Sequence, residues 1–346
     1  MRKSIYILFL ILVVSGCNGK ISPEKRGIRL NVGVSGLDTE TKAEGPFVDG
    51  EFTASVWFSY SPGTYPDDPS DDDTNLPNRI VTTFTSDKVS DIKDESGKLL
   101  QYPITPPDYG NTKIYCTGFY PSDGWSIVVD SQNPYSVTHP IDGKSDLMFA
   151  EQIAGSYQEN FGDFTFNHLL TWISFNASAT SVDAAAIWGN ITKLTITTPQ
   201  SSLTVTLSGS IGTPSTVNYS GETSVITVID TDTGTPLSVK AADLGSALCS
   251  PPYSKVIDSK TYYGYDISVS TTGINETKSI FVPLYSTNSQ PNTDPQPITD
   301  PQVAIGKQYV LSLYFNEVAV VSGVCTLKYW EDEREDLYVD RPDQAS

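Results

Sequence analysis

Short segments in which every second residue is apolar recur along almost the whole chain, and turn-forming residues separate them. Clear examples begin at Ile28, Phe52, Ile280 and Tyr309. Successive side chains of a β-strand point to opposite faces, so this period of two predicts strands with one buried face. Helical patterns are scarce, and only Val182 to Trp188 suits one or two helical turns. Roughly a dozen such strands predict an all-β protein of antiparallel sandwiches, because each amphipathic sheet must bury one face against another.

The stretch from Asp146 to Ala177 contains the densest apolar run that follows the N-terminal segment, and it holds one of the two histidines. Alternate positions from Phe164 to Phe175 are apolar on both faces. We therefore expect one central strand that is covered on both sides, at a junction between sheets or domains. His168 lies on the same predicted face as Trp172 and is interpreted as a hydrogen-bonded core histidine.

The first residues form a processing signal. Arg2 and Lys3 precede an apolar run, and Val14-Ser15-Gly16-Cys17 places small residues just before a cysteine. The run is too short for a membrane-spanning helix of the mature protein. The small residues followed by cysteine resemble the bacterial lipobox, and this resemblance implies that Cys17 is lipidated and becomes the new N-terminus. A plain secretory signal with an incidental cysteine is the alternative.

The remaining chain has room for two domains, and its charge limits what they bind. About 330 residues follow the signal, at roughly 150 residues per domain. Asp plus Glu outnumber Lys plus Arg by 41 to 22, and the formal net charge is −19. Because such a field repels a phosphate backbone, no nucleic-acid partner is expected. Cys116, Cys249 and Cys325 remain after Cys17, and three thiols cannot all pair within one chain, so we expect no disulfide framework.

No catalytic constellation stands out in the sequence. It contains neither G-x-S-x-G nor G-x-G-x-x-G. His139 precedes Pro140 in a loop-like context and is expected to be exposed. Any two of the acidic residues could converge as a glycosidase pair, but the sequence singles out none. We therefore expect a protein that is not an enzyme and that uses no cofactor.

An acidic loop near residue 73 has the beginning of a calcium-binding pattern. Asp71, Asp73 and Asn75 match the first three ligand positions of an EF-hand loop. Leu76 stands where that loop needs glycine, and Thr82 stands where a bidentate glutamate would close the ligand shell. We therefore expect a solvated acidic loop and no metal site.

A series of short motifs, in this order and spacing, resembles the fimbrillin family, the lipoprotein precursors of type V pili. The motifs are the lipobox, Thr41-Lys42-Ala43, Gly118-Phe119-Tyr120-Pro121, Asp146-Leu147-Met148-Phe149-Ala150, Phe164-x-Phe166-x-His168-Leu169 and Gly306-Lys307-Gln308-Tyr309-x-Leu311. The resemblance runs over nearly the whole chain. It implies two β-sandwich domains of transthyretin-like topology with few short helices, which we assign to 28–160 and 161–346, after the signal and lipobox at 1–17.

The resemblance also implies a mechanism of assembly. In this family a trypsin-like surface protease removes the first strand after Arg or Lys, and a C-terminal strand of the next subunit fills the groove. On this sequence the removed strand is Ile28 to Val34, and the cut falls between Lys42 and Ala43. Many relatives carry Arg at this position, so an arginine-specific protease would not cut here. The donor strand would come from the region of Thr326 to Val339, and its candidate groove-filling residues are Leu327, Tyr329, Trp330, Leu337 and Val339.

The implied product is a stalk, tip or accessory pilin of surface fimbriae that supports cell adhesion. Its partners would be other pilin subunits, in a homo- or heteropolymer, the processing protease, and the outer membrane through the lipid on Cys17. The tail after Trp330 is acidic for a segment that becomes buried, which favours a tip, accessory or anchor subunit. The alternative is a surface glycan-binding outer-membrane lipoprotein. Trp57, Trp172 and Trp330 argue against it, because each falls in a strand pattern that suits core packing.

Overall fold

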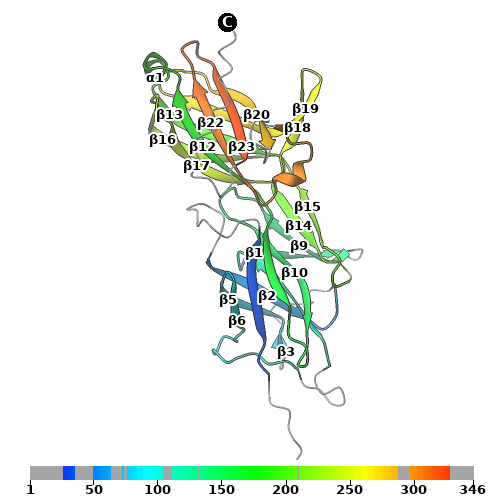
Figure 1. Cartoon of the computed structure of the whole chain (residues 1–346). Helices are drawn as coiled ribbons and strands as arrows, with labels where there is room; N and C mark the ends of the chain where they lie inside the picture. The colour runs from blue at the N-terminus through cyan, green and yellow to red at the C-terminus, as the bar shows by residue number, and fades with distance from the viewer. Residues whose placement is uncertain are drawn as a thin grey trace, which may run out of the picture.

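The computed structural model describes residues 26–35, 50–63, 72–73, 76–103, 111–130, 133–208, 210–286 and 296–327. These residues form β-strands, one α-helix, α1 (Val182–Trp188), and one 3₁₀-helix, η1 (Pro301–Ala304). The predicted all-β class is therefore confirmed. Two large sheets lie towards opposite ends of an elongated molecule, and β9, β14 and β15 lie between them (Figure 1).

The first sheet has seven strands in the order β5-β2-β7-β10-β11-β1-β6. Its strands are β1 (Arg29–Ser35), β2 (Glu51–Ser59), β5 (Arg79–Thr85), β6 (Lys88–Asp91), β7 (Ile114–Tyr120), β10 (Met148–Gly155) and β11 (Asp163–His168). β5 and β6 follow each other in the chain and yet are the two ends of the sheet. The turn between them is bonded to the residue just before β2 and to β1. Ser86 N donates to Gly50 O at 2.7 Å, and Asp87 N donates to Val32 O at 2.8 Å. The sheet therefore curls around a single core.

The first core lies inside this curl. It contains inward side chains of strands from both ends of the sheet, among them Ile28, Leu30, Val32, Phe52, Val56, Phe58, Phe84, Ile92, Phe164 and Phe166. The alternation that predicted β1 and β2 thus corresponds to burial of every second residue against this core.

The second sheet has ten strands. Along its main path the order is β16-β13-β19-β20-β23-β22-β12-β17, while β18 pairs with β19 and β21 pairs with β20. Its strands are β12 (Thr171–Ala179), β13 (Asn190–Thr198), β16 (Ser224–Pro236), β17 (Ala242–Cys249), β18 (Tyr253–Ile257), β19 (Lys260–Thr271), β20 (Lys278–Ser286), β21 (Gln296–Pro297), β22 (Gln308–Phe315) and β23 (Val321–Leu327). A second core includes Phe175, Trp188, Tyr265, Leu311 and Phe315.

Helix α1 closes one end of the second core. It spans Val182–Trp188, the range that the sequence predicted. Ser181 caps its N-terminus, because the Ser181 hydroxyl accepts a hydrogen bond from Ala184 N at 3.0 Å. Gly189 ends the helix with a φ of 70°, a conformation that glycine adopts without strain. The buried Trp188 side chain attaches the helix to the second sheet by donating from Nε1 to Asn316 O at 2.8 Å.

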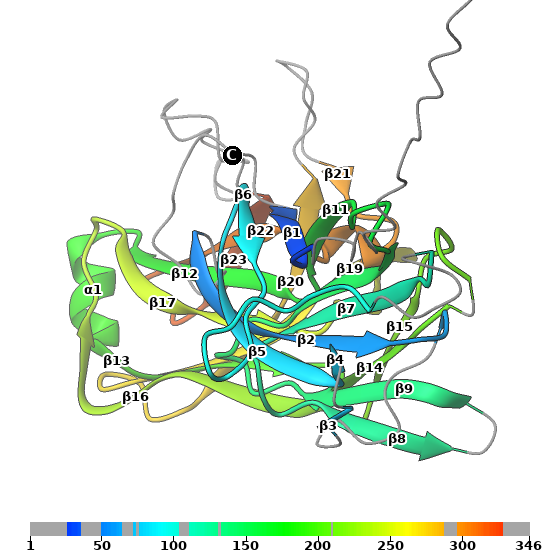
Figure 2. The same cartoon turned by 90° about the horizontal axis from the view of Figure 1, so that it is seen from below.

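A four-stranded sheet connects the two large ones. Its order is β15-β14-β9-β8, with β8 (Ser126–Asp130), β9 (Asn133–Pro140), β14 (Ser202–Thr206) and β15 (Thr216–Ser220). A third core combines side chains of this sheet with those of both large sheets, including Trp57, Phe119, Phe149, Leu170, Trp172, Leu203 and Val205. In the end-on view β8 and β9 lie on one side of the molecule and β1 and β11 on the other (Figure 2). A two-stranded ribbon of β3 (Asp72–Asp73) and β4 (Leu76–Pro77) completes the described strands.

The expectation of one central strand from Phe164 to Phe175 is wrong. β11 ends at His168, and β12 begins at Thr171 in the other large sheet. Leu169 and Leu170 make the crossing, and both are buried in the third core. The domain boundary expected at 161 assigns β11 to the second domain, whereas β11 pairs with β1 and β10 of the first sheet.

The two histidines are both buried, which was expected for only one of them. His168 is a core residue, as predicted, and its Nδ1 lies 2.8 Å from Asp146 Oδ2. His139, expected to be exposed, is buried in β9, because its ring packs against Trp125 with 5.0 Å between ring centroids. Its Nδ1 lies 2.6 Å from the carbonyl oxygen of Pro140.

The structure describes only some of the residues on which the remaining sequence predictions rest. Trp57 and Trp172 are core residues, as predicted, whereas Trp330 lies outside the described residues. Cys116, Cys249 and Cys325 are buried free thiols. Asp71 and Asn75 of the acidic loop also lie outside the described residues. In the part of the chain that the structure describes, no group of three or more His, Cys, Asp or Glu side chains is placed to hold a metal ion.

Candidate functional site: the slot of the first strand

The candidate site is the place that β1 occupies in the first sheet. β1 runs parallel to β11 on one side and antiparallel to β6 on the other. In this register Val32 lies opposite Phe164 of β11, and Leu30 lies opposite Ser90 of β6. The space between β11 and β6 that β1 fills is called the β1 slot below.

The inward face of β1, together with Ile28 just before it, closes the first core. Ile28, Leu30 and Val32 are at most 1% exposed, and Val34 packs against the same cluster. Full burial of one aliphatic side chain stabilises a protein by about 1.5–3 kcal/mol. These three side chains are therefore the main reason that β1 stays in its slot, and loss of β1 would open the core to solvent.

The residues just before β1 are held by the segment that follows β6. Ile28 N donates to Leu100 O at 2.8 Å, and Ile92 N donates to Ile28 O at 3.1 Å. Tyr102 N donates to Arg26 O at 3.2 Å. The Tyr102 hydroxyl in turn accepts from Phe161 N at 3.2 Å, and burial raises the pKa of that hydroxyl. The slot therefore extends past the end of β6.

The outward face of β1 makes polar contacts with both neighbouring strands. Arg29 Nε donates to Asp91 Oδ1 of β6 at 2.8 Å, and both side chains are about half exposed at 59% and 44%. Asn31 Nδ2 donates to Asp163 Oδ1 of β11 at 2.6 Å, and the Ser35 hydroxyl donates to Asn167 Oδ1. Exposed cross-strand pairs contribute about 0.2–1 kcal/mol each. They therefore fix the register of β1 more than they hold it in place.

The slot brings together backbone and apolar groups, which suits it to bind a strand. β6 pairs with β1 as its partner strand, and β11 has β1 on one side and β10 on the other. Without β1, one edge of β11 and one edge of β6 would present unpaired N–H and C=O groups to any extended segment. The apolar side chains of the first core would lie between these edges.

The structure places the predicted site residues unevenly. The predicted first strand, Ile28 to Val34, corresponds to β1 (Arg29–Ser35). Cys17, Lys42 and Ala43 lie outside the described residues.

Only one of the donor-strand candidates lies within the described residues. Leu327 ends β23, lies opposite Tyr309 of β22 and packs against the second core, so it belongs to a strand inside its own sheet. Tyr329, Trp330, Leu337 and Val339 lie outside the described residues.

Sequence patterns did not show which strands lie on either side of the β1 slot. β6 is a four-residue polar segment, Lys-Val-Ser-Asp, and Asp91 lies 62 positions from its partner Arg29. Asp163 lies 132 positions from Asn31. A period-two pattern within one segment carries no information about which distant strand lies beside it. The position of these two carboxylates beside β1 is therefore known only from the strand pairing.

Comparisons with known proteins give a signal for the N-terminus and a set of similar structures. Residues 1–18 match the prokaryotic membrane lipoprotein lipid attachment site, which agrees with the lipobox that precedes Cys17. A search of curated protein sequences found no match. Within the described residues no helix has the length and apolar character needed to span a membrane.

Several solved structures are similar to this chain over most of its length. A candidate cell adhesion protein from Bacteroides uniformis ATCC 8492 is 16% identical, with a TM-score of 0.49 over 88% of this chain and 98% of that chain. A candidate cell adhesion protein from Bacteroides ovatus ATCC 8483 is 14% identical, with a TM-score of 0.44 over 89% and 100%. A candidate adhesin from Bacteroides thetaiotaomicron VPI-5482 is 9% identical, with a TM-score of 0.46 over 88% and 97%.

Proposed function

We propose that this chain is a subunit of surface fimbriae that supports cell adhesion and is assembled by strand exchange at the β1 slot. One observation carries the proposal: β1 lies between two strands with three consecutive inward side chains in the core, and the next described strand begins only at Glu51. The intervening sequence contains Lys42, so a single cut there would separate β1 from the rest of the sheet.

The proposed sequence of events uses the contacts described above. The lipid on Cys17 carries the precursor to the outer membrane. A trypsin-like protease then cuts between Lys42 and Ala43, after which β1 is held by its contacts with β11, β6 and the first core alone. A strand from a neighbouring subunit takes its place and restores both the backbone ladders and the buried apolar surface.

The C-terminal end of the chain supplies the candidate donor in this proposal. Because Leu327 belongs to β23, a donor segment begins after it and contains Tyr329, Trp330, Leu337 and Val339. That segment is acidic, which favours a tip or accessory position over a repeating stalk position. The proposal assigns no catalytic step to this chain.

N-terminal sequencing of the protein recovered from the cell surface tests the proposal. We expect a mature N-terminus at Ala43 and co-purification of the chain with other fimbrial subunits in complexes that resist mild detergent. In cells that express the Lys42→Ala variant, the chain should keep its N-terminus at Cys17 and be absent from these complexes. Incorporation of a chain that still begins at Cys17 would refute strand exchange and favour an anchored binding protein.

A further inference from the structure

The outward side of the β1 slot carries several carboxylates. Asp91 pairs with Arg29, and Asp163 accepts a hydrogen bond from Asn31. Asp87 Oδ1, in the turn that leads into β6, lies 4.0 Å from the point at which a side chain at position 33 would begin. β1 meets this acidic wall with a guanidinium group, an amide and a glycine.

The inward side of the slot accepts only apolar groups. Ile28, Leu30 and Val32 fill three successive inward positions and are essentially unexposed. A charged side chain at any of these positions would lose its hydration without gaining a partner, which is costly in an apolar core. The slot therefore sets two requirements for an incoming strand: apolar residues at three alternate positions, and no negative charge on the outward face.

The C-terminal segment of this chain meets neither requirement. Residues 328–346 contain seven acidic and three basic side chains. After Leu327, the segment has one pair of aliphatic residues two positions apart, Leu337 and Val339. If these two occupy adjacent inward positions in either strand direction, Glu335 or Arg341 occupies the third. A charged group then enters the first core, and the outward residues add to the negative charge of the wall.

We propose that the β1 slot selects its incoming strand by this pattern and accepts a strand from a different subunit in place of segment 328–346 of a second copy. The accepted strand has aliphatic residues at three alternate inward positions and Lys, Arg or amide residues opposite Asp91 and Asp163. This inference rests on the proposed function, because the slot becomes available only when β1 leaves it. It makes this chain a component of a heteropolymer.

Fluorescence anisotropy of labelled peptides tests the selection. The purified full chain is cut by limited trypsin treatment, the cut after Lys42 is verified by N-terminal sequencing, and each peptide is added in excess. The first peptide has the sequence of residues 26–35, the second carries Arg29→Glu and Asn31→Asp in that sequence, and the third has the sequence of residues 328–342. The Lys42→Ala chain, treated identically, is the uncut control.

We expect the first peptide to bind the cut chain and not the control. Each exposed cross-strand pair is worth up to about fivefold in affinity, so the second peptide should bind about 5–25-fold more weakly. The third peptide should bind at least about a hundredfold more weakly, because it buries a charge. As a rescue, the Asp91→Arg chain should bind a peptide with Arg29→Glu alone more tightly than the unchanged chain does.

The possible failures are separable. Binding of the third peptide within tenfold of the first would overturn the selection while leaving strand exchange in place. Equal affinities of the first and second peptides, without rescue by Asp91→Arg, would overturn the role of the carboxylates. Failure of every peptide to enter the cut chain would overturn both this inference and the proposed function, because the slot would then not exchange its strand.

Discussion

Asp146 Oδ2 lies 2.8 Å from Nδ1 of His168, and both side chains are completely buried. Asp146 lies just before β10, and His168 is the last residue of β11, at the point where the chain leaves the first sheet. Burial, and then the charge of Asp146, raises the pKa of the Tyr120 hydroxyl at the end of the neighbouring strand β7. A buried carboxylate and its imidazole partner therefore fix the strand ends from which the crossing to the second sheet begins.

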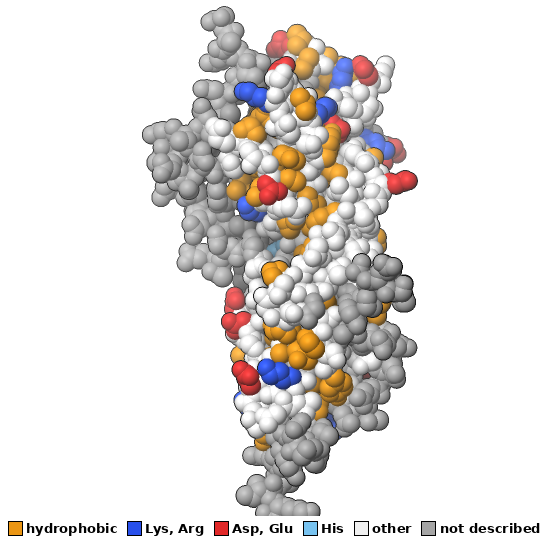
Figure 3. Space-filling view, turned by 90° about the vertical axis from the view of Figure 1, so that its right-hand side faces the viewer, with side chains coloured by type: hydrophobic (Ala, Val, Ile, Leu, Met, Phe, Trp, Pro, Cys, Tyr) orange, Lys and Arg blue, Asp and Glu red, His pale blue; other side chains and the backbone are white. Residues whose placement is uncertain are grey.

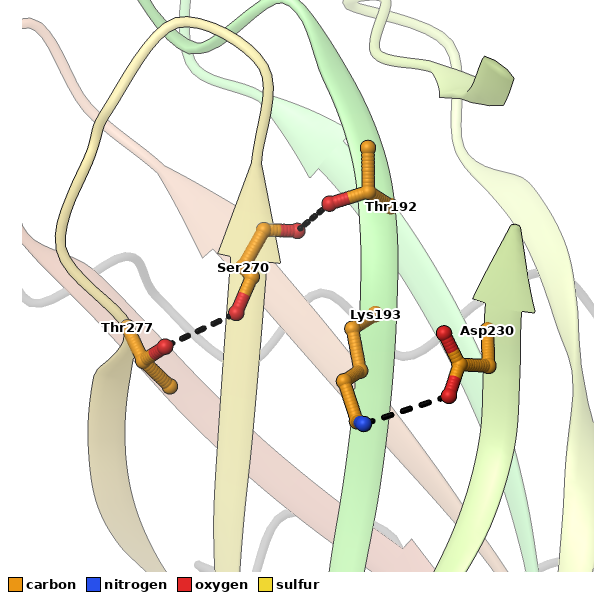
Figure 4. A network of polar contacts seen from close by, with 5 residues as sticks. All are labelled: Thr192, Lys193, Asp230, Ser270 and Thr277. Atoms are coloured by element: carbon orange, nitrogen blue, oxygen red, sulfur yellow. Dashed lines mark hydrogen bonds and ion pairs between the residues drawn. The ribbon is translucent and has the colours of Figure 1, made fainter. Parts of the chain in front are cut away.

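Removal of one partner of this pair should destabilise the fold strongly. Asp146→Ala leaves the His168 imidazole buried without its carboxylate, and loss of one member of a buried pair costs about 3–5 kcal/mol. Urea unfolding followed by tryptophan fluorescence measures the change in the free energy of unfolding. The matched control is Lys193→Ala at the exposed pair of Lys193 and Asp230, 3.1 Å apart on β13 and β16, where we expect a loss below about 1 kcal/mol (Figure 4). Equal losses in the two variants would contradict a structural role for the buried pair.

Truncation of the inward face of β1 should destabilise the first sheet. Leu30 is fully buried, and Leu→Ala substitutions in a core cost about 2–5 kcal/mol because they remove apolar contacts and leave a cavity. Val89 of β6 is 65% exposed, so Val89→Ala on the adjacent strand should stay within about 0.5 kcal/mol of the parent chain. The same urea titration compares the two variants. A Leu30→Ala chain as stable as the Val89→Ala chain would show that β1 does not close the core.

Close packing around Gly118 leaves no room for a methyl group. A Cβ atom at this position of β7 would lie 2.6 Å from Phe166 Cζ and 2.8 Å from Phe164 Cζ. Overpacking of this kind costs about 1–3 kcal/mol, so Gly118→Ala should be destabilising, and Phe166→Leu in the same chain should recover part of the loss.

Gly162 offers the matched control for Gly118. Nothing lies within 4 Å of a Cβ atom there, so Gly162→Ala should be neutral or stabilise by about 0.4–1 kcal/mol through reduced freedom of the unfolded chain. Thermal unfolding of both variants distinguishes the two outcomes. A destabilised Gly162→Ala chain together with an unchanged Gly118→Ala chain would invert the expected order.

The sequence predicted the elements whose pattern is local. β1 and β22 largely alternate between core and surface, whereas β2 and β7 are mostly buried on both faces. The apolar residues of these strands, like the pattern of α1, lie within one short segment, so each element was found close to its observed bounds. The crossing at Leu169 and Leu170 could not be found, because a turn buried in the third core carries none of the Gly, Pro or Asn residues that mark exposed turns.

The candidate site was only half predictable for the same reason. The buried residues of β1 follow from its alternation, but the slot walls depend on pairing between segments far apart in the chain. On the described part of the visible face, hydrophobic side chains lie in several groups among backbone and uncharged side chains, with a few charged residues between them (Figure 3). The composition of such a surface does not distinguish a strand that stays in its sheet from one that is exchanged. The charges on Asp91 and Asp163 become informative only when the register places Arg29 and Asn31 beside them.

The buried thiols and phenols should make the fold sensitive to alkaline pH. Burial raises the pKa of Cys116, Cys249, Cys325 and Tyr265 above their ordinary values. In the unfolded chain thiols titrate near about 8.5 and phenols near about 10, so above these values the unfolded state has lost protons that the folded state keeps. Stability is therefore fully present below about pH 8 and falls as the pH rises, by up to about 1.4 kcal/mol per pH unit for each group. Urea midpoints at pH 7, 9 and 10.5 measure the slope, which Cys249→Ala should make shallower between pH 9 and 10.5 even if it lowers stability at pH 7. A midpoint that stays constant up to pH 10.5 would mean that these groups have the same pKa in the folded and unfolded states, and it would contradict the prediction.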